Sequence, residues 1–129
     1  MGMTRILSFK AWTGEHYVGL AELLTSLGSA VEGHHWRVTV EEWIASSRGE
    51  AIADLVADSL VSTEHLIDLF GVDAQLIDGE LVGYPEGSST ADIRIRASDS
   101  SHWDVQSDKP EVLETILRIH PTAQDLTEW

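Results

Sequence analysis

The chain has 129 residues, with 22 acidic residues against 8 lysines and arginines, and a formal net charge of −14. It contains no cysteine, which excludes disulfides and thiolate metal sites. No run approaches the roughly 18 apolar residues of a membrane span, and no secretory leader pattern is present. We therefore expect a cytoplasmic protein with one domain over residues 1–129.

The first half of the chain is predicted to contain two strands and three helices. Residues 4–10 alternate as a strand, residues 17–31 place leucines at helical spacing, and residues 36–43 alternate again as a half-buried strand. Two further helices are expected, over residues 49–60 and from an N-cap at Ser62 to Gly71.

The second half is predicted to be rich in strands. Asp78 and Gly79 give the strongest short hairpin signal, so two short strands are expected around them. Residues 93–97 and 103–105 alternate and are expected to pair about a turn at residues 99–101.

A final helix is expected after these strands. Asp108 and Glu111 have the spacing of a capping box, Pro110 fits the first turn, and Pro121 stops the helix. The whole order predicts an α+β fold, a mainly antiparallel sheet with helices packed on one face. The residues expected in its core are Ile93, Ile95, Trp103, Val105, Leu113 and Leu117.

The acidic residues are concentrated in the middle of the chain. Between Glu41 and Asp92 there are twelve acidic residues against one base, Arg48, so this segment carries eleven of the fourteen net negative charges. Such a field attracts basic proteins and repels nucleic acid and anionic membranes. With no basic patch either, we expect no direct nucleic-acid binding and no membrane partner.

Two features within this segment indicate a partner-binding face. Trp43 falls on the polar side of its predicted strand, and an exposed Trp with a polar rim is typical of an interface anchor. In the predicted helix over residues 49–60, acids recur every fourth residue, a spacing that costs an isolated helix roughly 0.2–0.5 kcal/mol per pair. The predicted partner-binding residues are Glu41, Glu42, Trp43, Glu50, Asp54 and Asp58.

The histidine pair has a structural explanation simpler than metal binding. His34 and His35 are adjacent, so on a strand they point to opposite faces and do not share an ion. A composite site of His16, His34 and an acid has no supporting pattern in the sequence. We expect no metal site.

The other candidate groups also have structural explanations. Asp99, Ser101 and His102 have the residue types of a hydrolytic triad, but triads assemble from separate segments, and Asp and Ser here set a turn. Asp78, Glu80 and Asp92 stay open as magnesium ligands, because magnesium needs only one or two carboxylates. No phosphate-binding or dinucleotide motif is present. We therefore expect no catalytic residue and no cofactor, and the protein is not expected to be an enzyme.

Two stretches carry a resemblance to known sequences. They are residues 75–80 (QLIDGE) and residues 99–107 (DSSHWDVQS), which lead into the helix predicted over residues 108–118. Together they resemble a pattern in small uncharacterised bacterial proteins, some of them similar in size and acidity to immunity proteins that neutralise toxins. The resemblance covers the last third to half of the chain. It implies a bacterial interaction protein and transfers no site residue.

The favoured function is an acidic protein-binding module, an immunity or inhibitor protein that blocks the basic active site of a toxin or nuclease. A complementary acidic face speeds association. The alternatives are a nucleic-acid mimic, a small metal-dependent enzyme, and an acidic domain with no charge-specific partner. Mimicry needs a long array of acids, and the only regular stripe is at residues 50, 54 and 58.

Overall fold

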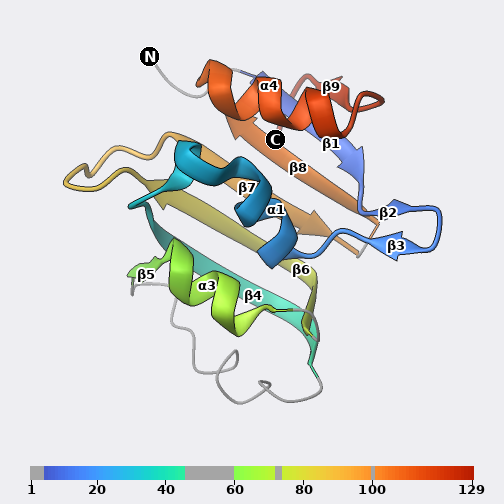
Figure 1. Cartoon of the computed structure of the whole chain (residues 1–129), viewed down its shortest axis with the longest axis horizontal. Coiled ribbons are helices and arrows are strands. Elements are labelled where there is room, and N and C mark those ends of the chain that lie inside the picture. Colours follow the sequence, from blue (N-terminus) through green and yellow to red (C-terminus); the bar gives the residue numbers. More distant parts are fainter. Residues whose placement is uncertain (1–4, 46–59, 72–73, 100) are drawn as a thin grey trace.

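The structure is a computed structural model that describes residues 5–45, 60–71, 74–99 and 101–129 (Figure 1). Its elements, in chain order, are β1 (Arg5–Lys10), β2 (Trp12–Thr13), β3 (His16–Tyr17), α1 (Leu20–Leu27), a 3₁₀ turn (Gly28–Val31), β4 (His35–Ala45), β5 (Leu60–Ser62), α3 (Thr63–Leu69), β6 (Ala74–Tyr84), β7 (Ile93–Ser98), β8 (His102–Ser107), α4 (Pro110–Ile119) and β9 (Gln124–Leu126).

Seven strands of the described chain form one antiparallel sheet, in the order β5-β4-β6-β7-β8-β1-β9. Helices α1, α3 and α4 lie against the same face of this sheet (Figure 1). The predicted α+β fold, a mainly antiparallel sheet with helices on one face, is therefore confirmed. Strands β2 and β3 form a separate small hairpin. None of the helices in the described ranges is long and apolar enough to cross a bilayer.

The core lies between the sheet and the helices. The strand residues predicted for it are buried: Ile93, Ile95, Trp103 and Val105. In α4 the buried residues are Val112 and Ile116, while Leu113 and Leu117 are partly buried and pack against the same cluster. Alternation along the strands sends polar residues to the opposite face of the sheet, which we call the open face.

Two local predictions are confirmed. Strands β7 and β8 pair as a hairpin, with Ser98 opposite His102, and Asp99 takes the left-handed backbone conformation (φ 51°) at the turn. Ser62 caps α3 by accepting a hydrogen bond from the backbone N–H of His65. Both rest on turn and cap chemistry that acts over three or four residues.

The hairpin predicted at Asp78 and Gly79 is wrong. Both residues lie inside one continuous strand, β6, which runs from Ala74 to Tyr84. A Cβ at Gly79 would lie 2.7 Å from the carbonyl oxygen of Thr39, so glycine permits the close approach of β4. The register of β4 on β6 shifts at this point. The glycine therefore marks a β-bulge and not a turn.

Other boundaries differ from the prediction. The predicted helix over residues 17–31 is α1 followed by the 3₁₀ turn, and residues 16–17 belong to β3. Leu60, predicted as a helix end, begins β5, while residues 49–59 lie outside the described ranges. The polar tail contains a strand, β9, which pairs with β1.

The capping box predicted for the last helix is also wrong. The N-cap of α4 is Lys109, with no side-chain cap hydrogen bond. Asp108 lies before this cap, so Glu111 has no capping partner there. The backbone N–H of Lys109 is instead satisfied by the hydroxyl of Ser107 at 3.1 Å.

Candidate functional site

A groove of about 650 Å³ lies on the helix-covered side, between α1, α3 and the β2–β3 hairpin. We call it the α1–α3 groove. It is lined by His16, Tyr17, Gly19, Ala21, Glu22, Thr25, Ser26, Ile67, Gly71 and Ala74. Most of its exposed lining is apolar.

The two helices present polar side chains around this groove because their apolar faces are used in the core. Helix α1 buries four leucines at helical spacing, which turns Glu22 and Thr25 outward. Helix α3 buries Leu66 and Leu69, which leaves Ile67 half-buried at the groove and Asp68 exposed outside the groove lining. The floor is therefore apolar and the rim is polar.

An aromatic pair closes the hairpin end of the groove. The ring of Trp12 lies 5.2 Å from that of Tyr17, and Trp12 remains 45% exposed. The hydroxyl of Tyr17 donates to the carbonyl oxygen of Leu76 at 3.3 Å. Burial raises the pKa of Tyr17 to about 12, so the phenol stays neutral at physiological pH. Tyr17 is held by its hydrogen bond to Leu76, and the ring of Trp12 that packs on it remains exposed.

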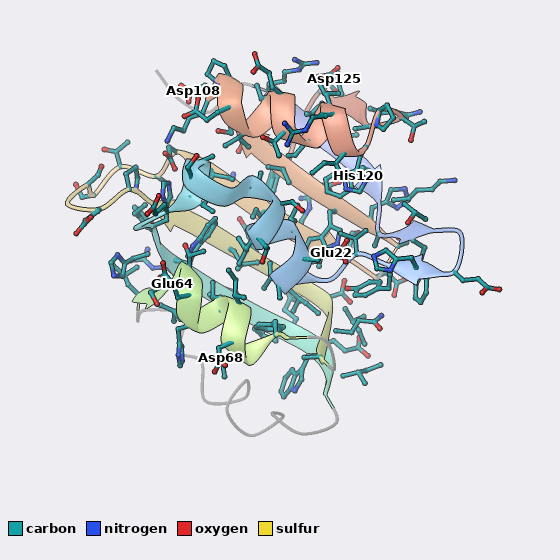
Figure 2. All side chains as sticks on the ribbon, viewed as in Figure 1. Glu22, Glu64, Asp68, Asp108, His120 and Asp125 are labelled. Carbon is teal, nitrogen blue, oxygen red and sulfur yellow. The ribbon has the colours of Figure 1, made fainter. Side chains whose placement is uncertain are left out.

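Helices α1 and α3, which border the groove, carry acidic side chains. Figure 2 places Glu22 on α1, and Glu64 and Asp68 on α3; of these, Glu22 lines the groove. The carboxylate of Glu22 lies 2.9 Å from Nε2 of His16, in an exposed pair. Burial lowers the pKa of His120, against the opposing effect of the Glu22 charge, so His120 adds no positive charge here at neutral pH. Among the described residues, the lining of the groove contains Glu22 and no lysine or arginine.

Three of the residues predicted for the partner-binding face, Glu41, Glu42 and Trp43, lie in the described part of the chain. Glu41 and Glu42 are exposed on β4. Strict alternation along β4 would place Trp43 on the open face of the sheet. The bulge between Val40 and Trp43 places two residues where alternation allows one, so Trp43 lies on the side of the sheet that the helices cover. There it is half-buried and packs against the core, so its predicted place on the polar face of the strand is wrong, while its role in partner binding stays a prediction. Glu50, Asp54 and Asp58 lie outside the described residues.

A buried polar cluster lies at the other end of the sheet. Nε2 of His34, which is 4% exposed, lies 2.9 Å from Oδ1 of Asp92, and Nζ of Lys109 lies 3.0 Å from Oδ2. The hydrogen bond with Asp92 raises the pKa of Lys109 above its usual range. His34 is buried and does not line the α1–α3 groove. This cluster links the residues that precede β4 and β7 to the N-cap of α4.

The predicted opposite orientation of the adjacent histidines is confirmed. His34 is buried, whereas His35 is exposed on β4. His16 is paired with Glu22 at the hairpin end, and His34 is paired with Asp92 at the far end. The composite metal site weighed for His16 and His34 is therefore not assembled.

The residues weighed for catalysis are held in structural roles. The hydroxyl of Ser101 donates to the carbonyl oxygen of Ser98 at 2.9 Å, and Nδ1 of His102 lies 3.0 Å from the same hydroxyl. Asp99 contributes the left-handed residue of the turn. This geometry is that of a hairpin turn.

The carboxylates weighed as magnesium ligands also lie apart. Asp78 accepts the backbone N–H of Asp99, Glu80 pairs with Arg94, and Asp92 belongs to the His34 cluster. Over residues 5–45, 60–71, 74–99 and 101–129, no group of three or more His, Asp or Glu side chains is placed to hold a metal ion.

Comparison with known proteins adds no assignment. No family model, no curated protein and no solved structure matches this chain.

The sequence reasoning missed the α1–α3 groove. Its walls come from segments about 45 residues apart, such as Glu22 and Ile67. The available signals were Trp12, a large aromatic residue in a predicted turn, and single acids at outward positions of apolar helices. Each is common in isolation, and only the fold brings them together.

Proposed function

We propose that the protein is an acidic binding module whose α1–α3 groove receives a cationic segment of a basic protein. The observation that carries the proposal is the combination of an apolar floor, an exposed Trp12 packed on Tyr17, and acids on both bordering helices, Glu22 in the groove lining and Asp68 on α3. Interfaces that bind tightly combine an aromatic anchor with a polar rim of this kind.

The two parts of the groove have different roles in this proposal. The acids attract a cationic partner from a distance and accelerate encounter, an effect that acts over about 8 Å at physiological salt. The apolar floor and the ring of Trp12 slow dissociation once contact is made. A partner segment that alternates Lys or Arg with apolar residues would match both the acids and the apolar floor.

An inhibitor of immunity type is the specific form of this function that the acidity supports best. The active-site clefts of nucleases and similar toxins are basic because they hold phosphate. An acidic module that blocks such a cleft gains a fast on-rate from charge complementarity. In this proposal the protein acts by occlusion and performs no chemistry.

Association kinetics with paired charge reversals test the proposal. Basic proteins that the immobilised chain retains at low salt are purified, and their kinetics are measured on wild type, on Glu22→Lys/Asp68→Lys and on Glu86→Lys/Glu114→Lys. Both variants change the net charge equally, and all four acids are exposed. Only the first pair lies on the two helices that border the groove, so its on-rate should fall about tenfold further than that of the control pair.

Salt and the aromatic anchor supply two independent readouts. The on-rate of the wild type should fall steeply between about 0.1 and 1 M salt, where the Debye length shrinks from about 10 to about 3 Å. Trp12→Ala should raise the off-rate and leave the on-rate nearly unchanged. Equal effects of the two reversal pairs would show that net charge alone matters, and the groove would then be the wrong site.

A further inference from the structure

The side chain of Trp129 covers two arginines on the open face of the sheet. The guanidinium carbon of Arg94 lies 4.5 Å from the centroid of the Trp129 ring, and that of Arg96 lies 4.3 Å from it. Nη1 of Arg96 also donates to the main-chain oxygen of Trp129 at 2.6 Å. One residue thus supplies a flat aromatic ring and an oxygen acceptor to the same two side chains.

The two arginines, which we call the arginine cradle, are fixed by other partners. Arg94 donates through Nε and Nη2 to Glu80 and through Nη1 to Gln106. Arg96 donates through Nε and Nη2 to Asp104. Both cations are therefore oriented by neighbouring strands, independently of Trp129. A receptor that is ordered before its ligand arrives loses less entropy on binding.

The segment that carries Trp129 is held weakly. Strand β9 has three residues, all exposed, and Thr127 and Glu128 after it are also exposed. Its ion pair, between Asp125 and Arg5, is exposed on both sides and contributes little. Short exposed segments of this kind open locally at small free-energy cost. Trp129 can therefore leave the cradle without unfolding of the sheet.

A second groove adjoins the cradle. It has a volume of about 590 Å³ and is lined by Ser8, Phe9, Lys10, His102, Asp104, Thr122, Gln124 and Leu126. Asp104 belongs to both features, because it lines this groove and holds Arg96. Lys10 and His102 are opposite each other across β1 and β8. A ligand at the cradle would have room beside it in this groove, whose lining combines polar side chains with Phe9 and Leu126.

We propose that the arginine cradle is a binding site for small aromatic carboxylates, and that Trp129 is its displaceable internal occupant. The aromatic ring of the ligand takes the place of the indole over the two guanidinium groups. One carboxylate oxygen takes the place of the main-chain oxygen at Nη1 of Arg96. Charge-assisted hydrogen bonds between arginine and a carboxylate are strong, and planar guanidinium groups stack well on aromatic rings. This site is independent of the α1–α3 groove.

Trp129→Ala exposes the site for a direct test. Indole-3-acetate and the uncharged indole-3-acetamide are matched probes, added at about 0.15 M salt, where the Debye length of about 8 Å limits repulsion by the net negative charge. Calorimetry should give binding of indole-3-acetate at least about tenfold tighter to the variant than to the wild type, because Trp129 no longer competes. Indole-3-acetamide should bind the variant about tenfold more weakly than the carboxylate does.

Arg96→Lys in the Trp129→Ala background is the control for the cradle. Lysine keeps the charge opposite Asp104 and loses the planar, forked donor, so the preference for the carboxylate probe should largely disappear. Trp129→Leu, which keeps an apolar cover, serves if Trp129→Ala does not fold. In the wild type, the Nε–H resonances of Arg94 and Arg96 should shift as indole-3-acetate is added. Equal binding of the two probes, or unchanged binding in Arg96→Lys, would overturn the proposal.

Discussion

Arg96 and Asp104 face each other across β7 and β8, with Nη2 of the guanidinium 2.6 Å from Oδ2 of the carboxylate. Asp104 is 5% exposed, although it lies on the open face of the sheet and not in the core. Its charge is therefore largely removed from water and depends on Arg96. Removal of one partner from such a pair leaves the other charge uncompensated.

Asp104→Asn should lower the free energy of unfolding by about 3 kcal/mol. This is the lower end of the range for a broken buried pair, chosen because the Arg96 side chain is 29% exposed. Urea denaturation measures the change. Asp125→Asn removes the exposed partner of Arg5 and should have little effect. Equal losses in the two variants would mean that burial of Asp104 has no energetic role.

Trp103→Ala should lower the free energy of unfolding by about 3–5 kcal/mol. The side chain is 1% exposed, and its Nε1–H donates to the carbonyl oxygen of Val18 at 2.7 Å. The substitution therefore leaves a cavity and an unpaired acceptor. Trp12→Ala, at the exposed ring, should cost about 1 kcal/mol or less. Similar values for the two substitutions would contradict the placement of Trp103.

His120→Phe should make the protein more resistant to mild acid. Burial lowers the pKa of His120 below its usual 6.5 in the folded state, whereas the unfolded state keeps the usual value. The unfolded state therefore binds more protons just below pH 6.5, and wild-type stability falls as the pH falls through this window. Phenylalanine retains a ring against Phe9, whose centroid lies 4.1 Å from that of His120, and does not titrate. Parallel stability curves for the two proteins between about pH 6.5 and 5 would contradict this account.

Tyr17→Phe should reduce stability at neutral pH and then lose that disadvantage in alkali. The lost hydrogen bond to Leu76 costs about 1 kcal/mol. Because burial raises the pKa of Tyr17 from 10.0 to about 12, the wild type loses stability as the pH rises from 10 towards 12. Phenylalanine carries no such dependence, so the two stability curves should converge. Absorbance titration of the phenolate checks the shift itself, and a constant gap between the curves would contradict it.

Local signals predicted much of the fold. The alternation of residues 93–97 and 103–105 predicted β7 and β8, because one face of each strand is buried. Ser62 predicted the start of α3, because a cap needs only the first turn. These signals depend only on residues close together in the sequence, so the folded protein retains the local structures that they predict.

The errors arise where a distant strand decides the local geometry. Asp78 and Gly79 form a turn sequence, yet Gly79 is a strand residue because Thr39 of β4 passes close to its Cα. Trp43 follows the polar alternation of its strand, yet the same bulge turns it to the core. Neither the bulge nor its partner is visible in a sequence window.

The candidate sites were still harder to predict than the fold. The α1–α3 groove joins a hairpin, a helix and a second helix, and the arginine cradle joins β7 to a residue more than thirty positions later. The count of charges along the sequence drew attention to Glu41 and Glu42, and both side chains are exposed on β4. It had no means to show that Glu22 and Tyr17, on which Trp12 packs, line the same groove.

The position of β1 in the sheet has a consequence for how the chain folds during synthesis. Arg5 pairs with Ser107, and Ile6 pairs with both Gln106 and Leu126. At about 5–20 residues per second, a ribosome makes the partners of β1 on the order of 5–20 s after β1 itself. The apolar side chains of this strand stay unpaired throughout that interval. Completion of the sheet, and closure of the core over Leu7 and Phe9, must therefore wait until the last strands have emerged from the ribosome.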